Sequence, residues 1–191
     1  MKFTWVLTAI FVLTGSACTR AQSSATDAPK ATATIKDIMD SMVDPSGDFL
    51  FESTAEIADA NGITHKAPHT DEEWEEVRRR ALVLLEAPNL LVMEGRKVAN
   101  PSDKSKNPEI ELEPEKIQTL VDGDRPSFIR RARRLQDAAG LVLKAIEAKD
   151  KDALFHSLDG IDKACESCHL HYWYPNDKRA QEAAKRDGIV D

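Results

Sequence analysis

Five consecutive residues near the end of the chain, Cys165-Glu166-Ser167-Cys168-His169, combine two thiols and an imidazole at a fixed spacing. On a helix, Cys168 and His169 follow Cys165 by three and four positions, so the three side chains project from one face. Two thiols placed in this way can bond to the two vinyl groups of one porphyrin, and the imidazole that follows can coordinate its iron. The pattern C-x-x-C-H therefore predicts covalent attachment of one haem c.

Two other chemistries use closely spaced cysteines. A zinc site usually needs four ligands, and the histidines that could complete one with Cys165, Cys168 and His169 have no familiar pair spacing. Those histidines are His65, His69, His156 and His171. A redox dithiol of the thioredoxin type belongs in a βαβ context, which this sequence lacks, and the adjacent His169 favours haem over a plain disulfide.

Composition limits the class of protein. A chain of 191 residues, 41% of them apolar, can bury one core, so a single domain is expected. Helix-forming residues are abundant and strand-like alternation is hard to find, which predicts an all-α fold. The net charge of -7 argues against a nucleic-acid or anionic-lipid binder and suits basic redox partner proteins.

The N-terminal segment has the pattern of an export signal. A basic start is followed by the apolar run Phe3 to Thr14, which is too short to span a bilayer. We therefore expect a secretory signal peptide at 1–17 and a location in the periplasm. Gly15 to Cys18 resembles a bacterial lipobox, although Gly15 stands where Leu is usual. Cys18 could thus be a lipidated membrane tether, and ordinary cleavage after Ala17 or Ala21 is the alternative.

Residues 18–33 are small and polar, which predicts a flexible tether before the folded domain. A helical face then begins after Thr34. Its apolar residues recur at helical spacing and are Ile35, Ile38, Met39, Met42 and Val43. Both methionines should therefore face inward. Pro45 should kink or restart this helix, which we expect to continue to a stop at Asn61-Gly62.

A second helix should begin at Thr70, because Glu73 three positions later completes a capping-box pattern. Its expected inner face is Trp74, Val77, Ala81, Leu84 and Leu85. Pro88 should kink it before Gly95. Residues 95–124 then form a long connection, with a short helical turn near Glu115 to Val121.

Two more helices complete the domain. The third should start near Asp124, with the inward seam Phe128, Ala132, Leu135, Ala139, Val142 and Ile146. The fourth should follow Lys149-Asp150 and end at Pro175, with Leu154, Leu158, Ile161, Cys165, Cys168 and Tyr172 facing inward. Four such stripes predict an antiparallel four-helix bundle over 34–175, followed by a charged tail at 176–191.

These features resemble the class II c-type cytochromes, that is, cytochrome c′ and its low-spin, methionine-ligated relatives. The likeness rests on C-x-x-C-H in the last helix and on Ile38-Met39 in the first, which is similar to a Leu-Met pair of the low-spin members. It implies haem c bonded to Cys165 and Cys168, with His169 as an axial ligand and Met39, or alternatively Met42, as the sixth ligand. Breaks at Val43-Asp44-Pro45 and Pro88 and the ending His171 to Pro175 mark a divergent branch.

The resemblance implies a monohaem electron carrier rather than an enzyme. The main alternative is a five-coordinate haem protein that binds or senses diatomic gases such as NO or CO, as cytochrome c′ itself does. A zinc-binding structural module is a third hypothesis. Relatives of this family often dimerise through their first two helices, so a homodimer is also open.

Overall fold

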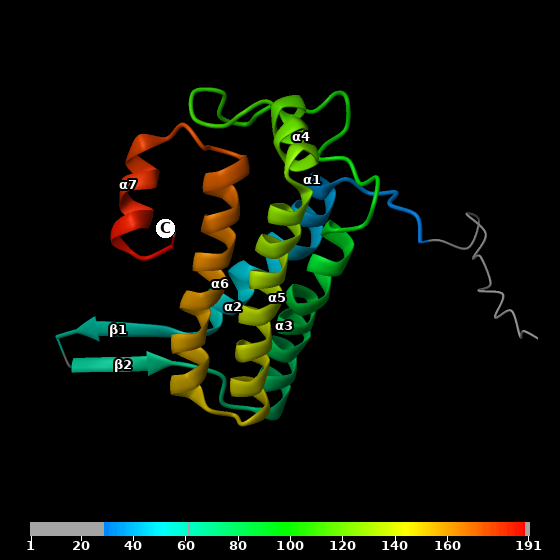
Figure 1. Cartoon of the computed structure of the whole chain (residues 1–191). Coiled ribbons are helices and arrows are strands. Elements are labelled where there is room, and N and C mark those ends of the chain that lie inside the picture. The colour runs from blue at the N-terminus through cyan, green and yellow to red at the C-terminus, as the bar shows by residue number, and fades with distance from the viewer. Residues whose placement is uncertain (1–28, 61, 190–191) are drawn as a thin grey trace, which may run out of the picture.

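The computed structural model of the chain describes residues 29–60 and 62–189 (Figure 1). The signal peptide, Cys18 and most of the tether expected at 18–33 lie outside the described residues. The described part is mostly helical, as predicted, with one small two-stranded sheet. Within that part, no helix combines the length and the apolar character needed to cross a bilayer.

The first helical run consists of three consecutive pieces, α1 (Ile35–Ile38), η1 (Met39–Val43) and α2 (Asp44–Ser53). Thr34 caps α1, and a reciprocal hydrogen bond from its own N–H to Asp37 completes a capping box. The middle piece, η1, is a π-helical turn. Pro45 explains it, because proline has no N–H to donate and its ring would clash with the carbonyl four residues earlier in a regular helix. The break predicted at Pro45 is thus a π-helical turn, where the helix is locally wider, and Met39 and Met42 both lie in this turn.

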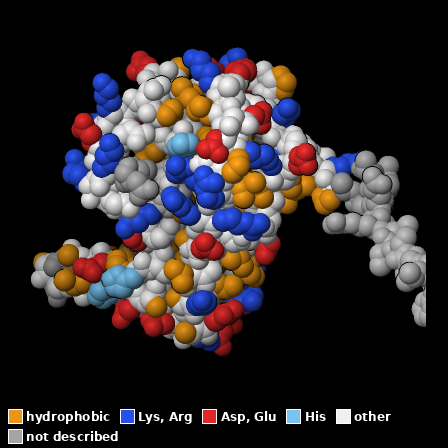
Figure 2. Space-filling view, viewed as in Figure 1, with side chains coloured by type: hydrophobic (Ala, Val, Ile, Leu, Met, Phe, Trp, Pro, Cys, Tyr) orange, Lys and Arg blue, Asp and Glu red, His pale blue; other side chains and the backbone are white. Residues whose placement is uncertain are grey.

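The segment after Thr54 is a hairpin and not the continuation of this helix that the sequence analysis predicts. β1 (Ala55–Asp59) pairs antiparallel with β2 (Gly62–Lys66), from Ala55 opposite Lys66 to Asp59 opposite Gly62. Asn-Gly is a hairpin signal, so the helix stop predicted at Asn61-Gly62 is wrong. The hairpin stands clear of the helices (Figures 1 and 2), so Ile57 and Ile63 are 50% and 61% exposed.

The other three long helices agree with the sequence prediction. α3 (Asp71–Leu91) begins at the capping box of Thr70 and Glu73 and continues through Pro88. α5 (Arg125–Glu147) and α6 (Lys151–Tyr172) begin behind the aspartate caps Asp124 and Asp150. The expected seam of α5 is buried in full. A shorter helix, α4 (Pro114–Gly123), lies where a helical turn is expected.

The long helices share one core. α5 packs against both α3 and α6, and α2 also contacts both of these helices. The largest side chains buried there include Leu50, Leu84, Leu154, Ile161 and Tyr172. This packing sets the end of α6 beside η1 and the long connection after α3.

The charged tail predicted at 176–191 holds a regular helix, α7 (Lys178–Arg186), where no more than a loose amphipathic turn was expected. This helix folds back beside α6 (Figure 1), and its residue Ala184 is buried there. A hydrogen bond from Gln181 Nε2 to Leu170 O, at 2.9 Å, also holds α7 against α6. Only this narrow face is apolar, which explains why the surrounding charge concealed the helix in the sequence.

Candidate functional site

The two cysteines of C-x-x-C-H lie on the last turns of α6, half-buried against the core. Both are free thiols. Burial raises the pKa of Cys165 and of Cys168 to about 12, so both stay protonated at neutral pH. A redox dithiol of the thioredoxin type depends on a thiol whose pKa is lowered. The environment of these thiols therefore does not favour that alternative.

His169 is the third member of the motif. Burial lowers the pKa of its imidazole, against the opposing influence of Glu166 and Asp44. The ring is therefore neutral at pH 7 and keeps a nitrogen lone pair that can bind a metal. Its centroid lies 5.9 Å from that of Trp173 and 6.1 Å from that of Tyr174. These aromatic neighbours restrict the directions in which the imidazole can turn.

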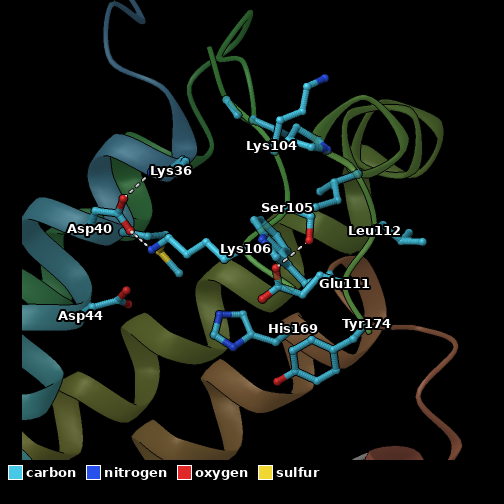
Figure 3. A pocket seen from close by; sticks show the side chains of 16 residues that line it. Lys36, Asp40, Asp44, Lys104, Ser105, Lys106, Glu111, Leu112, His169 and Tyr174 are labelled. Atoms are coloured by element: carbon cyan, nitrogen blue, oxygen red, sulfur yellow. Dashed lines mark hydrogen bonds and ion pairs between the residues drawn. The ribbon is translucent and has the colours of Figure 1, made fainter. Parts of the chain in front are cut away.

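His169 and Met39 line the same cavity, which has a volume of about 200 Å³. Its walls come from α1, η1, the start of α2, the connection 98–112 with the first turns of α4, and the end of α6. Figure 3 shows the ring of His169 pointing from α6 into this space, toward the side where Asp40 and Asp44 lie. Met42 is not among the lining residues. The thioether of Met93 is engaged elsewhere, where it accepts a hydrogen bond from Arg96 Nη2 at 3.1 Å.

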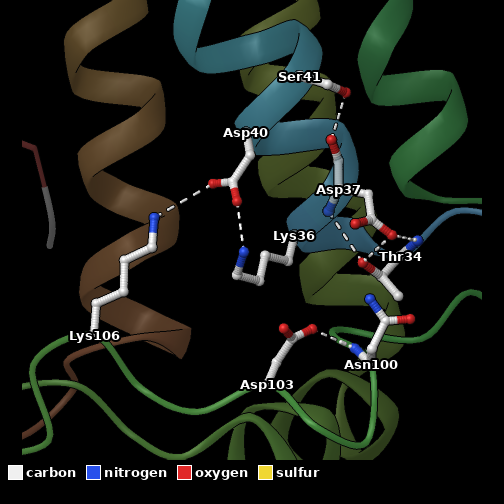
Figure 4. A network of polar contacts seen from close by, with 8 residues as sticks. All are labelled: Thr34, Lys36, Asp37, Asp40, Ser41, Asn100, Asp103 and Lys106. Atoms are coloured by element: carbon white, nitrogen blue, oxygen red, sulfur yellow. Dashed lines mark hydrogen bonds and ion pairs between the residues drawn. The ribbon is translucent and has the colours of Figure 1, made fainter.

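Charged groups gather at the mouth of the cavity. Lys106 Nζ lies 3.6 Å from Asp40 Oδ1, and Lys36 Nζ lies 2.5 Å from the other oxygen of the same carboxylate (Figure 4). Asp44 also lines the cavity, and burial raises the pKa of its carboxyl group. The Lys106 contact joins the connection to η1 across the cavity.

Residues 104–112, here called the covering loop, form one side of this mouth. The loop is anchored at its far end, where Leu112 N donates to Trp173 O at 2.7 Å. Within it, Ser105 Oγ donates to Glu111 Oε2 at 3.0 Å. Upstream of the loop, Lys36 N donates to Val98 O at 2.9 Å, which attaches the connection to α1. The sequence analysis describes this stretch only as a connection, because no local pattern reveals which distant elements a loop will contact.

The donor set suits haem c. Two thiols, one neutral imidazole and one soft thioether are the groups that such a cofactor uses for attachment and axial ligation. The cavity is smaller than the roughly 300–1,000 Å³ of typical ligand pockets. Neither Cys165 nor Cys168 lines it, so a macrocycle bonded to both thiols would need the walls of the cavity, the covering loop among them, to move. In the described residues, no group of three or more His, Cys, Asp or Glu side chains is placed to hold a metal ion, which the zinc hypothesis would need.

The remaining histidines lie away from His169. His171 is exposed on α6 and packs edge-on against Tyr172. His65 is on β2 and is exposed. The Nδ1 of His69 lies 3.0 Å from Lys151 Nζ. None of these three histidines lines the cavity that His169 shares with Met39.

No family model, curated protein or solved structure matches the chain. What this chain can do must therefore be inferred from the residues of the site. Three observations carry it: the half-buried thiols of Cys165 and Cys168, the neutral imidazole of His169, and the cavity that this imidazole shares with Met39.

Proposed function

We propose that this chain is an exported monohaem c-type electron carrier. The core helices α2, α3, α5 and α6 would form an antiparallel four-helix bundle around haem c held by Cys165 and Cys168. His169 would be one axial ligand and Met39 the other. The observation that carries the proposal is the cavity shared by His169 and Met39, which come from opposite ends of the sequence.

Each protein group has a distinct role in this proposal. A bound haem c supplies one-electron chemistry by alternating between ferric and ferrous iron. His169 offers a neutral nitrogen donor, and the Met39 thioether favours the ferrous state and so raises the reduction potential. The apolar core behind Cys165 and Cys168 limits water access and lowers the local dielectric, which also tunes the potential.

The covering loop would act as the movable wall of the site. The ion pair between Lys106 and Asp40 is largely exposed, and such pairs contribute only about 0–1 kcal/mol, so breaking this contact at the mouth costs little. Lys36, Lys104 and Lys106 supply ammonium groups at the mouth that can pair with the propionates of the cofactor.

Partners and location follow from the same proposal. The net charge of -7 favours basic redox partner proteins, which it would attract over long range. Export to the periplasm depends on the N-terminal signal, with lipidated Cys18 as the tether to the membrane. A homodimer is compatible with this role, and nucleic acid is not an expected partner.

The absorption spectrum of protein matured with haem-attachment machinery tests the proposal. We expect a six-coordinate, low-spin spectrum in both oxidation states and slow binding of carbon monoxide. A high-spin spectrum with rapid binding of carbon monoxide would replace the carrier with the gas-binding alternative. A colourless protein that retains zinc would favour the structural module.

A further inference from the structure

A second cavity, of about 280 Å³, lies between α5, α6 and α7. Ser167 and His171 line it from α6. Ser167 is two residues from both Cys165 and His169, which corresponds to about 200° around an α-helix. The second cavity therefore opens on the face of α6 opposite Cys165 and His169, whereas Cys168 is only one residue, about 100°, from Ser167. Nothing in the electron-transfer proposal uses it.

The lining of this cavity is basic. Arg131 and Arg134 enter from α5, Lys185 from α7 and His171 from α6. None of the three permanent cations lies within 4.0 Å of a carboxylate among the described residues, although the chain as a whole carries a net charge of -7. Figure 2 shows Lys and Arg side chains gathered in the middle of the face formed by these helices. Like charges held together without counter-charges repel one another, so a bound anion would stabilise the cluster.

Hydrogen bonds hold part of the cluster in place. Arg131 Nη1 donates to the carbonyl oxygen of Ser167 at 2.8 Å and to its hydroxyl oxygen at 2.6 Å. Arg134 Nη1 donates to the same hydroxyl at 3.3 Å. Ser167 itself is only 2% exposed, so its two hydrogen bonds hold the Arg131 guanidinium in place, whereas Arg134 is exposed and makes one longer bond. Arginines fixed in this way lose little freedom on binding an oxyanion.

One donor in the cluster lacks an acceptor. The Nε–H of Arg131 is buried and has no hydrogen-bond partner among the described residues. Buried donors are nearly always paired in native proteins, so an unpaired one marks a place where an acceptor is expected. The planar guanidinium presents its donors in a fork that matches two oxygens of a phosphate or carboxylate.

We propose that this cavity binds a small oxyanion with two negative charges, of the phosphate or phosphate-monoester class. Its size suits one such group better than an extended polymer, and three permanent cations suit a dianion better than a monovalent ion. The phosphate could be free in solution or belong to a lipid headgroup, since the chemistry of recognition is shared. The proposal does not depend on haem attachment.

Isothermal titration calorimetry of the full chain with inorganic phosphate, at constant ionic strength set by chloride, tests the proposal. We expect saturable binding at one site. Arg134→Gln and Lys185→Gln should each weaken it about tenfold, because each removes a charge-assisted contact. These two variants are preferred to Arg131→Gln, which would also remove the bonds that hold Ser167.

Matched controls remove the same charges outside the cavity. Arg133→Gln on α5 and Lys178→Gln on α7 should leave the affinity for phosphate within about twofold, since neither residue lines the cavity. Sedimentation with vesicles that contain phosphatidic acid, a lipid whose headgroup is a phosphate monoester, compared with vesicles of phosphatidylcholine alone, identifies the source: vesicle binding lost in Lys185→Gln, without binding of free phosphate, assigns the site to lipid headgroups. The proposal is overturned if neither phosphate nor vesicles bind, or if the control variants weaken binding as much as the cavity variants.

Discussion

Met39 on η1 and His169 on α6 line one cavity, whereas Met42, on the same π-helical turn as Met39, does not line it. This difference separates two methionines that helical spacing alone could not distinguish. Both had the helical spacing of an inward face, and one turn of helix separated them. The π-helical turn changes the directions in which they point, because its backbone is wider than that of an α-helix.

Met39→Ala should therefore open the sixth coordination position of a bound haem. We expect a change from a low-spin to a high-spin ferric spectrum and a fall in reduction potential, because the thioether that favours ferrous iron is lost. Spectroscopy and potentiometry on the matured protein measure both effects.

Met42→Ala is the matched control. It should keep the low-spin spectrum and lower the free energy of unfolding by about 1–2 kcal/mol, since Met42 is only half-buried against the core. A high-spin spectrum in Met42→Ala, together with an unchanged spectrum in Met39→Ala, would transfer the ligand assignment to Met42.

Lys106→Ala should loosen the covering loop. Lys106 joins the loop to Asp40 across the mouth of the cavity, and an exposed pair of this kind contributes about 0–1 kcal/mol. We expect amide hydrogen exchange in residues 104–107 of the haem-free protein to become about two- to fivefold faster. Lys104→Ala serves for comparison, because its partner Glu115 lies 4.0 Å away on neighbouring α4 and not across the cavity. Equal rates of amide hydrogen exchange in the two variants would mean that the contact between Lys106 and Asp40 does not hold the covering loop in place.

The buried thiols predict a loss of stability in alkali for the haem-free protein. Burial raises the pKa of Cys165 and Cys168 from 9.0 to about 12 in the folded state. Between these values the folded protein binds more protons than the unfolded one, so the free energy of unfolding falls as pH rises from about 9 toward 12. Urea unfolding at pH 7 and pH 10.5 measures the fall.

The double variant Cys165→Ala, Cys168→Ala isolates this contribution from other groups that titrate in alkali. Its stability should fall less between the two pH values than that of the parent protein. An equal fall in both proteins would mean that the thiols are not desolvated in the folded state.

The sequence predicted the elements whose signals are local. Thr70 with Glu73, Asp124 and Asp150 gave the starts of α3, α5 and α6, because capping depends on residues close together in the chain. The grouping of Cys165, Cys168 and His169 on one helical face followed from helix geometry alone. Those predictions needed no knowledge of tertiary packing.

The features that escaped prediction depend on tertiary structure or on a local signal that was misread. The hairpin of β1 and β2 has the local signal Asn61-Gly62, but the same pair is also typical of the end of a helix. The covering loop brings Lys106 and Glu111 to the site through contacts with η1 and the end of α6, which no sequence period encodes. α7 is held largely by a single buried alanine and a side-chain hydrogen bond from Gln181 to Leu170.

The central claim is that Cys165 and Cys168 carry one covalently attached haem. Intact-mass spectrometry of protein matured in a host with haem-attachment machinery tests it most directly. The account predicts an added mass of one porphyrin that survives acid and organic solvent and disappears in Cys165→Ala, Cys168→Ala. Free thiols with no added porphyrin mass in the parent protein would contradict it.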